Sequence, residues 1–168
     1  GACPDIVKYS KSHAAIHEER ELLDIANARF ADNGVEQKQR YLISHGDNHD
    51  NVCFSTLICS DLLDIQSRAD FRGKVDILFV PAWNKDVETY SSLVEAAAYD
   101  IHAYVVLCNS REFGDTRLRS PARNDYDRDV VRIRGGLQDF FVVGEVDVEG
   151  LRRFQSRYHS PDRPFKPT

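Results

Sequence analysis

The sequence lacks long apolar runs, methionine and paired-cysteine motifs. Its longest uninterrupted apolar stretch, residues 77–83, contains a proline and is far shorter than the ~20 residues that span a bilayer. The first residues offer neither the charged start nor the apolar segment of a secretory signal peptide. We therefore expect no membrane partner. The absence of methionine from a chain that begins with glycine indicates a processed or partial polypeptide.

Net positive charge is also missing. The 22 Lys and Arg residues against 27 Asp and Glu residues give a net charge of −5, which does not favour strong nucleic-acid binding. Arginines gather in residues 111–134, where they alternate with aspartates. This pattern favours a self-paired, solvated loop, and contact with an anion or a nucleic acid is the alternative. With 42% hydrophobic and 29% charged residues, the composition is that of a folded globular chain.

Cysteine is scarce and unpaired in sequence. Four cysteines are present, and no two of them form a Cys-x-x-Cys pair, which argues against a thiol zinc site or a thioredoxin-type motif. Cys53, Cys59 and Cys108 lie in or at the end of apolar, strand-like runs, where cysteines are usually buried and reduced. The cysteines therefore predict a protein of the reducing cytoplasm. We also expect no bound metal and no cofactor.

Hydrophobic periodicity predicts alternating helices and strands. The predicted helices cover about residues 12–32, 62–68, 84–99 (with Asn84 as its cap) and 151–158. The predicted strands cover residues 40–44, 52–58, 75–80 (ending at Pro81), 103–107, 129–134 and 140–148. A long loop is expected at 110–127 and a Pro-rich tail at 156–168. This order implies an α/β fold with a helix-covered sheet, to which the last two strands add antiparallel through Gly135–Gly136.

A candidate nucleophile lies at the end of the second strand. The apolar strand ends at Cys59, and a helix begins at once. The thiol is then next to helix N–H groups, which stabilise a thiolate. The Ser60 backbone N–H can donate to an oxyanion, and Asp61 can cap the helix. This geometry suits a nucleophile, but a core cysteine at the end of a buried strand is the alternative.

Four stretches, taken together, resemble the nitrilase (carbon–nitrogen hydrolase) superfamily in order and approximate spacing. The resemblance covers about residues 5–155. The stretches are Tyr9-x-Lys11-x-His13, Leu57–Ile58–Cys59–Ser60–Asp61, the apolar run from Val75 to Trp83, and the run from Ala103 to Asn109. Taken alone, a lysine before a helix such as Lys11 would be read as a solvated surface residue.

The resemblance implies a four-layer α-β-β-α sandwich and a catalytic Glu–Lys–Cys set. Cys59 would attack the carbon of a small-molecule amide or nitrile, Lys11 would stabilise the developing charge, and water would hydrolyse the thioester. The general-base glutamate of the family lies on an early strand, well before the lysine. We therefore expect residues 1–168 to be the C-terminal part of one nitrilase-like domain, completed by the remainder of a parent chain. The family tends to pair subunits, so we expect a homo-oligomer.

Further residues are candidates for positioning substrate. Family members often carry a second glutamate shortly after the lysine, and Glu19 is a better match for it than Glu18. Trp83 and Asn84 follow a strand at the side where ligands enter α/β sheets, although Trp83 could equally be an ordinary core residue. One departure is found in residues 97–102, which replace the Arg-Ala-x-Glu-Asn pattern of the family and leave specificity open.

Two other functions stay open. In the first, a metal hydrolase, the spacing of His13 and His17 would allow both to hold a divalent ion. Its other candidate ligands are Glu18, His45, Asp47, His49 and Asp50. In the second, the chain is a binding or regulatory module of a larger polypeptide, similar to the modules fused to bacterial defence-associated reverse transcriptases. The arginine-rich residues 111–134 would then face nucleic acid or a partner chain.

Overall fold

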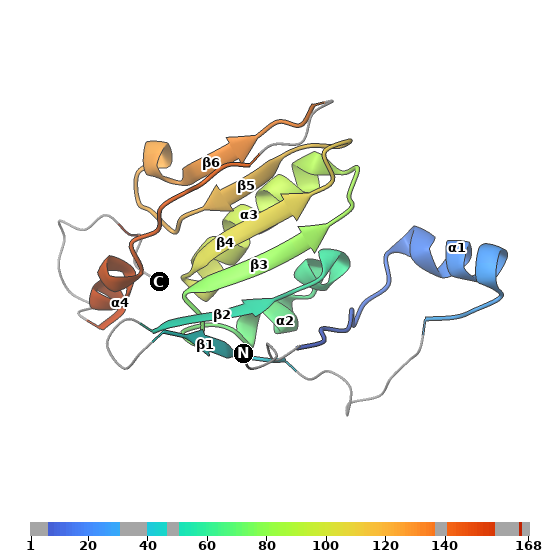
Figure 1. The fold of residues 1–168 in the computed structure, drawn as a ribbon, viewed down its shortest axis with the longest axis horizontal. Coiled ribbons are helices and arrows are strands. Elements are labelled where there is room, and N and C mark those ends of the chain that lie inside the picture. Colours follow the sequence, from blue (N-terminus) through green and yellow to red (C-terminus); the bar gives the residue numbers. More distant parts are fainter. Residues whose placement is uncertain (1–6, 31–39, 47–50, 137–140, 157–164, 166–168) are drawn as a thin grey trace, which may run out of the picture.

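The computed structural model describes residues 7–30, 40–46, 51–136, 141–156 and 165 (Figure 1). Its helices and strands follow one another in the order α1 (Ile16–Ala26), β1 (Ile43–His45), β2 (Val52–Thr56), the 3-10 helix η2 (Cys59–Leu63), α2 (Ile65–Ala69), β3 (Ile77–Ala82), α3 (Val87–Ile101), β4 (Tyr104–Asn109), β5 (Thr116–Arg119), the 3-10 helix η3 (Asp125–Asp127), β6 (Asp129–Ile133) and α4 (Val148–Ser156). Within these residues, no helix is long and apolar enough to cross a membrane.

One six-stranded sheet organises the chain, with its strands in sequence order from β1 to β6. The pairs β2–β3 and β3–β4 are parallel, whereas β1, β5 and β6 each join antiparallel. Helices α2 and α3 lie behind the sheet in the view of Figure 1, and α4 lies at one end of the opposite face. The predicted α/β fold is confirmed. Of the two strands expected to add antiparallel, only the one at 129–134 forms within the described residues, as β6, and its antiparallel partner is β5.

The main core lies between the sheet and α3. Leu78, Val80, Val105 and Leu107 alternate along β3 and β4 and are buried together with the inner face of α3. Parallel strands covered by helices read as continuous apolar runs, which is why the sequence predicts these two strands well. The cap of α3 differs from the prediction: Asp86 accepts the Thr89 backbone N–H, and Asn84 lies two residues earlier.

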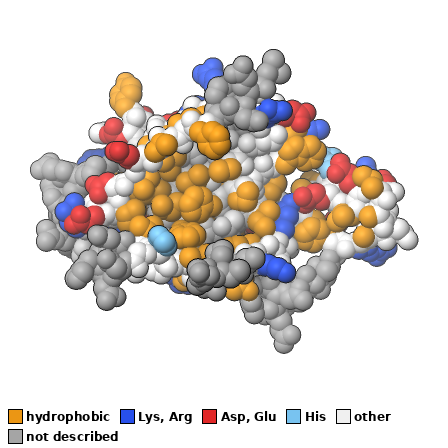
Figure 2. Space-filling model, viewed as in Figure 1, with side chains coloured by type: hydrophobic (Ala, Val, Ile, Leu, Met, Phe, Trp, Pro, Cys, Tyr) orange, Lys and Arg blue, Asp and Glu red, His pale blue; other side chains and the backbone are white. Residues whose placement is uncertain are grey.

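The opposite face of the sheet is also apolar. Leu151 and Phe154 of α4 pack there against Tyr104 and Leu118, but only at one end. Figure 2 shows hydrophobic side chains spread across the rest of this face. Phe54 of β2 and Phe79 of β3 meet edge to face, with ring centroids 5.7 Å apart. A sheet that is apolar on both faces fits the inner layer of a sandwich.

Strand β3 runs through Pro81 to Ala82, whereas the sequence predicts that it ends at Pro81. Phe79 still accepts a hydrogen bond from Leu57 N on the β2 side, and Ala82 accepts one from Ser110 N on the β4 side. Because alternate residues of a strand face opposite neighbours, Pro81 faces the side where β2 has already ended. Its missing N–H therefore removes no ladder hydrogen bond.

The predicted long loop at 110–127 contains a strand, β5, and two of the arginines expected to be solvated are buried in it. Arg117 and Arg119 are only 3% and 7% exposed. Arg119 binds Asp129 at 2.6 Å and Glu95 of α3 at 3.1 Å, and Arg117 binds Asp115. Self-pairing is confirmed, and solvation holds for the exposed Arg111, Arg123, Arg132 and Arg134 but not for these two arginines. These carboxylates allow two arginines to occupy core positions of the strand.

The predicted strand at 140–148 is absent, because residues 141–147 form no strand, and residue 140 lies outside the described residues. The segment instead passes over the β5–β6 face. A side chain at Gly144 would come within 2.8 Å of Leu118 and Val131. The glycine thus permits a close crossing in place of edge pairing. Helix α4 begins at Val148, earlier than predicted, and most of the predicted tail at 156–168 lies outside the described residues.

Helix α1 is shorter than its prediction and is separate from the core. No residue of α1 is buried, and Ile16 and Ile25 are almost fully exposed. Figure 1 shows α1 away from the sheet, joined to it by the extended segment that precedes it. That preceding segment reaches the candidate site, and Glu18 in the first turn of α1 pairs with Lys11 of the segment.

Candidate active site

Cys59 lies on a sharp turn between β2 and a short helix. The parallel pairing of β2 extends one residue past the strand, to Leu57, and η2 begins at Cys59. Cys59 has a φ of +49°, which is uncommon for a residue with a side chain. Such conformations cluster at functional sites. The thiol is half-buried, while Ser60 and Asp61 behind it are buried, so the predicted strand-to-helix turn is confirmed.

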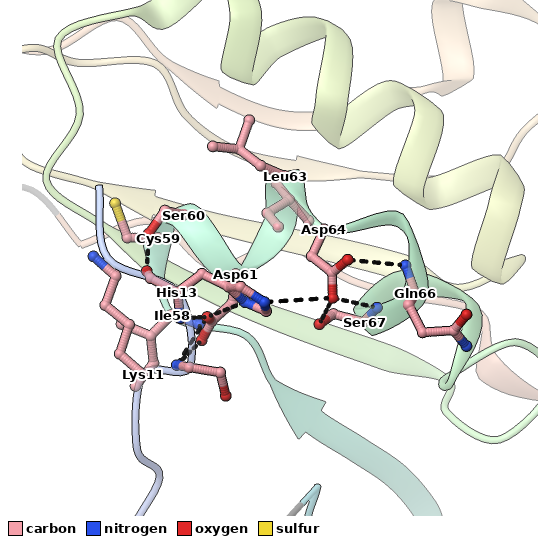
Figure 3. A network of polar contacts seen from close by, with 12 residues as sticks. Lys11, His13, Ile58, Cys59, Ser60, Asp61, Leu63, Asp64, Gln66 and Ser67 are labelled. Atoms are coloured by element: carbon pink, nitrogen blue, oxygen red, sulfur yellow. Dashed lines mark hydrogen bonds and ion pairs between the residues drawn. The ribbon is translucent and has the colours of Figure 1, made fainter. Parts of the chain in front are cut away.

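The Asp61 carboxylate attaches the lysine segment to this turn. It is 1% exposed and accepts hydrogen bonds from Ser12 N at 2.9 Å and from His13 N at 2.7 Å. The His13 ring adds Nδ1 at 3.1 Å, and the Ser60 hydroxyl donates to the His13 carbonyl. Figure 3 shows this network. Two segments almost 50 positions apart in sequence are thereby held together through buried bonds.

Asp64 continues the network one turn further on. Its carboxylate lies 3.8 Å from His13 Nε2 and accepts the Gln66 and Ser67 backbone N–H groups at the start of α2. The Ser67 hydroxyl, chiefly, holds the pKa of Asp64 below its ordinary value, although partial burial opposes this. Asp64 is therefore the cap of α2. Asp61 accepts the Ile58 backbone N–H at 3.4 Å at the start of η2, as expected for a cap, and also binds the lysine segment.

Lys11 forms an ion pair with Glu18 at the rim of the cluster. Only 12% of the Lys11 side chain is exposed, and Figure 3 shows it directed toward the Cys59 thiol. Glu18 also accepts the Ala15 backbone N–H at 2.7 Å. Burial raises the pKa of Glu18, but the bonds from Lys11 and Ala15 outweigh it and leave the pKa lowered. Glu19, the better match in the sequence, is exposed to solvent.

Tyr90 of α3 contacts the thiol from the opposite side. Its hydroxyl lies 3.5 Å from Cys59 Sγ, and the residue is only 3% exposed. Burial, and then the contact with Cys59, raise the pKa of the Tyr90 hydroxyl, while a hydrogen bond with Asn84 lowers it. Sequence reasoning assigned no role to Tyr90. The available signal was a phenol on an otherwise apolar face, because a buried hydroxyl needs a partner.

Trp83 and Asn84 follow β3 at the same end of the sheet. Trp83 is 62% exposed, so it is not a core residue, and its ring packs against Phe113 with centroids 5.6 Å apart. Asn84 exchanges two hydrogen bonds of 2.9 Å with the Asn109 side chain, which joins the ends of β3 and β4. The Asn84 backbone therefore links the ends of two strands, whereas Trp83 lies on the outer surface.

The other two described cysteines have different surroundings. Burial raises the pKa of Cys53, and the nearby Asp76 carboxylate adds to this effect. Desolvation by its neighbours likewise raises the pKa of Cys108, although part of this residue reaches the open face of the sheet. Both are poor candidates for an ionised thiol at neutral pH.

The metal-hydrolase hypothesis depends on residues that the structure only partly describes. Asp47, His49 and Asp50 lie outside the described ranges. Within those ranges, no group of three or more His, Cys, Asp or Glu side chains is arranged to hold a metal ion. His13 faces the Asp61 carboxylate instead.

The fold and this turn define a layered α/β protein with a cysteine between a strand and a helix. No family model matches the sequence, and no curated protein is significantly similar to it. Solved structures are similar. XC1258 from Xanthomonas campestris, a CN-hydrolase superfamily protein, aligns with a TM-score of 0.62 and 16% identity over 89% of this chain and 56% of that one.

Two further structures have the same architecture. A variant of the Nesterenkonia AN1 amidase, from the nitrilase superfamily, aligns with a TM-score of 0.54 and 13% identity over 78% of this chain and 47% of its own. Nit3 from Saccharomyces cerevisiae, of branch 10 of that superfamily, aligns with a TM-score of 0.50 and 17% identity over 73% and 47%. The chain has a nitrilase-superfamily fold, and it spans about half the length of these structures.

Proposed function

We propose that this chain supplies the nucleophile and the oxyanion cation of a carbon–nitrogen hydrolase that acts on a non-peptide amide or nitrile. One observation carries the proposal: the buried Asp61 carboxylate binds the backbone after Lys11 to the turn that bears Cys59. A nucleophile and a cation from distant parts of the chain are thereby held at one place, as acyl-transfer chemistry requires.

The chemistry follows from these groups. Cys59 Sγ attacks the amide carbon, a C–S bond forms, and the carbonyl electrons move to oxygen. The Lys11 ammonium and the Ser60 backbone N–H stabilise that oxygen. The C–N bond then breaks, the amine leaves with a proton, and water hydrolyses the thioester to the acid. The resemblance assigns the proton transfers to a glutamate on an earlier strand.

The substrate-positioning residues are assigned in the same way. Glu18 pairs with Lys11 and keeps the ammonium in place, so we assign to it the role that the sequence gave to Glu19. Asn84 forms a hydrogen bond with the Tyr90 hydroxyl, which in turn contacts the Cys59 thiol. Trp83 and Phe113 form the outer rim of the site on this side.

Adducts in the similar structures support a reactive cysteine. A structure of the Nesterenkonia amidase shows the result of Michael addition of acrylamide at its active-site cysteine, and XC1258 carries an arsenic adduct in its active site. In this chain, the buried arginines Arg117 and Arg119 are paired with carboxylates, which favours the hydrolase over a nucleic-acid contact at residues 111–134. We further propose a cytoplasmic, paired protein whose nitrilase-like domain includes residues 1–168.

Acrylamide labelling, resolved by peptide mass spectrometry in the full-length protein, tests the nucleophile. Cys59 should react fastest, while Cys53 and Cys108 stay nearly inert. Cys59→Ser should abolish the fast label and leave the other two sites unchanged, and Cys108→Ser is the matched control. A Cys59 that labels no faster than Cys53 and Cys108 contradicts the proposal.

A further inference from the structure

We propose that the Tyr90 hydroxyl donates a hydrogen bond to Cys59 Sγ and is a catalytic residue of this site. The inference rests on the proposed nucleophilic role of Cys59. The observation is the 3.5 Å contact between Tyr90 Oη and Cys59 Sγ, made by a side chain that is 3% exposed. No part of the hydrolase chemistry described above requires a phenol at this position.

The neighbours of Tyr90 set the direction of this hydrogen bond. Burial raises the pKa of the Tyr90 hydroxyl, so at neutral pH it keeps its proton. Asn84 Oδ1 already accepts the Asp86 backbone N–H at 2.6 Å, which leaves the Asn84 amide N–H groups to face the phenol oxygen. The phenol proton then points to the sulfur.

Helix α3 fixes the hydroxyl before any substrate arrives. Asp86 caps the helix, and the Tyr90 backbone N–H donates to the Asp86 carbonyl in its first turn. Asn109 holds Asn84 through two hydrogen bonds, and Val94, one turn after Tyr90, is completely buried. A donor held in this way stabilises charge on sulfur without reorganisation.

The role requires no proton transfer by Tyr90. The hydroxyl stabilises the thiolate before attack, and it stabilises the same sulfur again when the thioester C–S bond breaks. Charge-assisted hydrogen bonds are roughly twice as strong as neutral ones, so the interaction favours the ionised thiol over the neutral one. It therefore has a measurable signature: the pH at which Cys59 becomes reactive.

Iodoacetamide alkylation rates from pH 5 to 10, resolved by site in the full-length protein, test this inference. In Tyr90→Phe, the pH midpoint of Cys59 alkylation should move up by about one unit, which corresponds to ~1.4 kcal/mol. The rate at neutral pH should fall roughly tenfold. Tyr99→Phe is the matched control on the same helix, because the Tyr99 hydroxyl donates to the Ala122 carbonyl, and its midpoint should not move.

The outcomes separate this inference from the proposed function. If wild-type Cys59 reacts no faster than Cys53 and Cys108, the nucleophile assignment fails. If Cys59 is fast and Tyr90→Phe leaves its midpoint unchanged, or Tyr99→Phe moves it equally, the role of Tyr90 is overturned and the nucleophile stands. Should Tyr90→Phe fail to fold, 3-fluorotyrosine at position 90 replaces it. This analogue is a stronger donor of similar size, and it should move the midpoint down; no movement overturns the inference.

Discussion

Two buried polar clusters contact α3, and they use charge in different ways. Around the Cys59 turn, backbone N–H groups satisfy the Asp61 carboxylate, and the thiol and the Lys11 ammonium lie at the edge of the cluster. Around β5, guanidinium and carboxylate groups satisfy one another, as Arg119 does with Asp129 and Glu95.

The way in which charge is neutralised distinguishes the candidate site around Cys59 from the purely structural cluster around β5. When side-chain charges neutralise each other in the core, little is left for a ligand, and the cluster joins β5 and β6 to the helix. The Asp61 carboxylate instead binds the backbone N–H groups of Ser12 and His13. The neighbouring thiol and ammonium groups are then held in place without being neutralised by Asp61. Similar residue types thus form a candidate reactive site in one cluster and a structural contact in the other.

The largest effect on activity is expected from Lys11→Ala. Loss of one group that stabilises the oxyanion costs roughly 100-fold to 1,000-fold in kcat. The measurement is ammonia release by the full-length protein from a panel of small primary amides and nitriles. Lys11→Arg keeps the charge and should retain part of the activity. Thermal unfolding should change little, and full turnover by Lys11→Ala would exclude the oxyanion role.

The largest effect on stability is expected from the other cluster. Arg119→Met removes the buried partner of the Asp129 and Glu95 carboxylates. Because both carboxylates are partly exposed and Glu95 keeps Arg128 at 3.2 Å, we expect a cost of about 1–3 kcal/mol. Urea unfolding measures this loss. Arg132→Met is the matched control, because its side chain is 44% exposed, and it should cost no more than about 1 kcal/mol. Equal costs for the two would contradict the distinction between buried and exposed pairs.

The apolar pattern of the sequence predicts the strands that are buried on both faces. It does not predict a strand whose buried positions carry charged side chains. Strands β3 and β4 read as unbroken apolar runs, so their existence follows from composition alone. Strand β5 does not, because Arg117 and Arg119 occupy buried positions only with the help of Asp115, Asp129 and Glu95. Those partners lie on other elements, and no local pattern marks them.

Some features of the candidate site can likewise be predicted from local sequence, and others cannot. A cysteine at the end of an apolar strand is a local signal, and the turn at Cys59 follows from it. The attachment of His13 to Asp61 and the contact of Tyr90 with Cys59 join residues 48 and 31 positions apart. Periodicity carries no information about such pairs. Proximity of Lys11 to the turn was implied by the resemblance, and only the structure shows the bonds that produce it.

Removal of the Asp61 charge should loosen the site without dismantling the fold. In Asp61→Asn, an amide N–H group replaces one acceptor facing Ser12 and His13, and the cost of an unsatisfied buried group is about 1–3 kcal/mol. Hydrogen exchange at the Ser12 and His13 amides should become faster, and labelling of Cys59 slower. Asp64→Asn, which affects the start of α2, is the control and should leave the Ser12 amide protected.

The smallest effect is a pH dependence at the rim of the Cys59 cluster. The pKa of Glu18 is lower in the folded chain than in the unfolded one, so the stability that its ion pair adds is present above the unfolded value and is lost as pH falls through the folded value. An ordinary glutamate titrates near ~4.3, so the loss should occur below about pH 4. Exchange of the Ala15 amide, which donates to Glu18, should accelerate in that range relative to the Tyr90 amide within α3. In Glu18→Gln, this acid-induced acceleration should disappear; if it persists unchanged, another group controls the lysine segment, and Glu18 does not hold Lys11 in place.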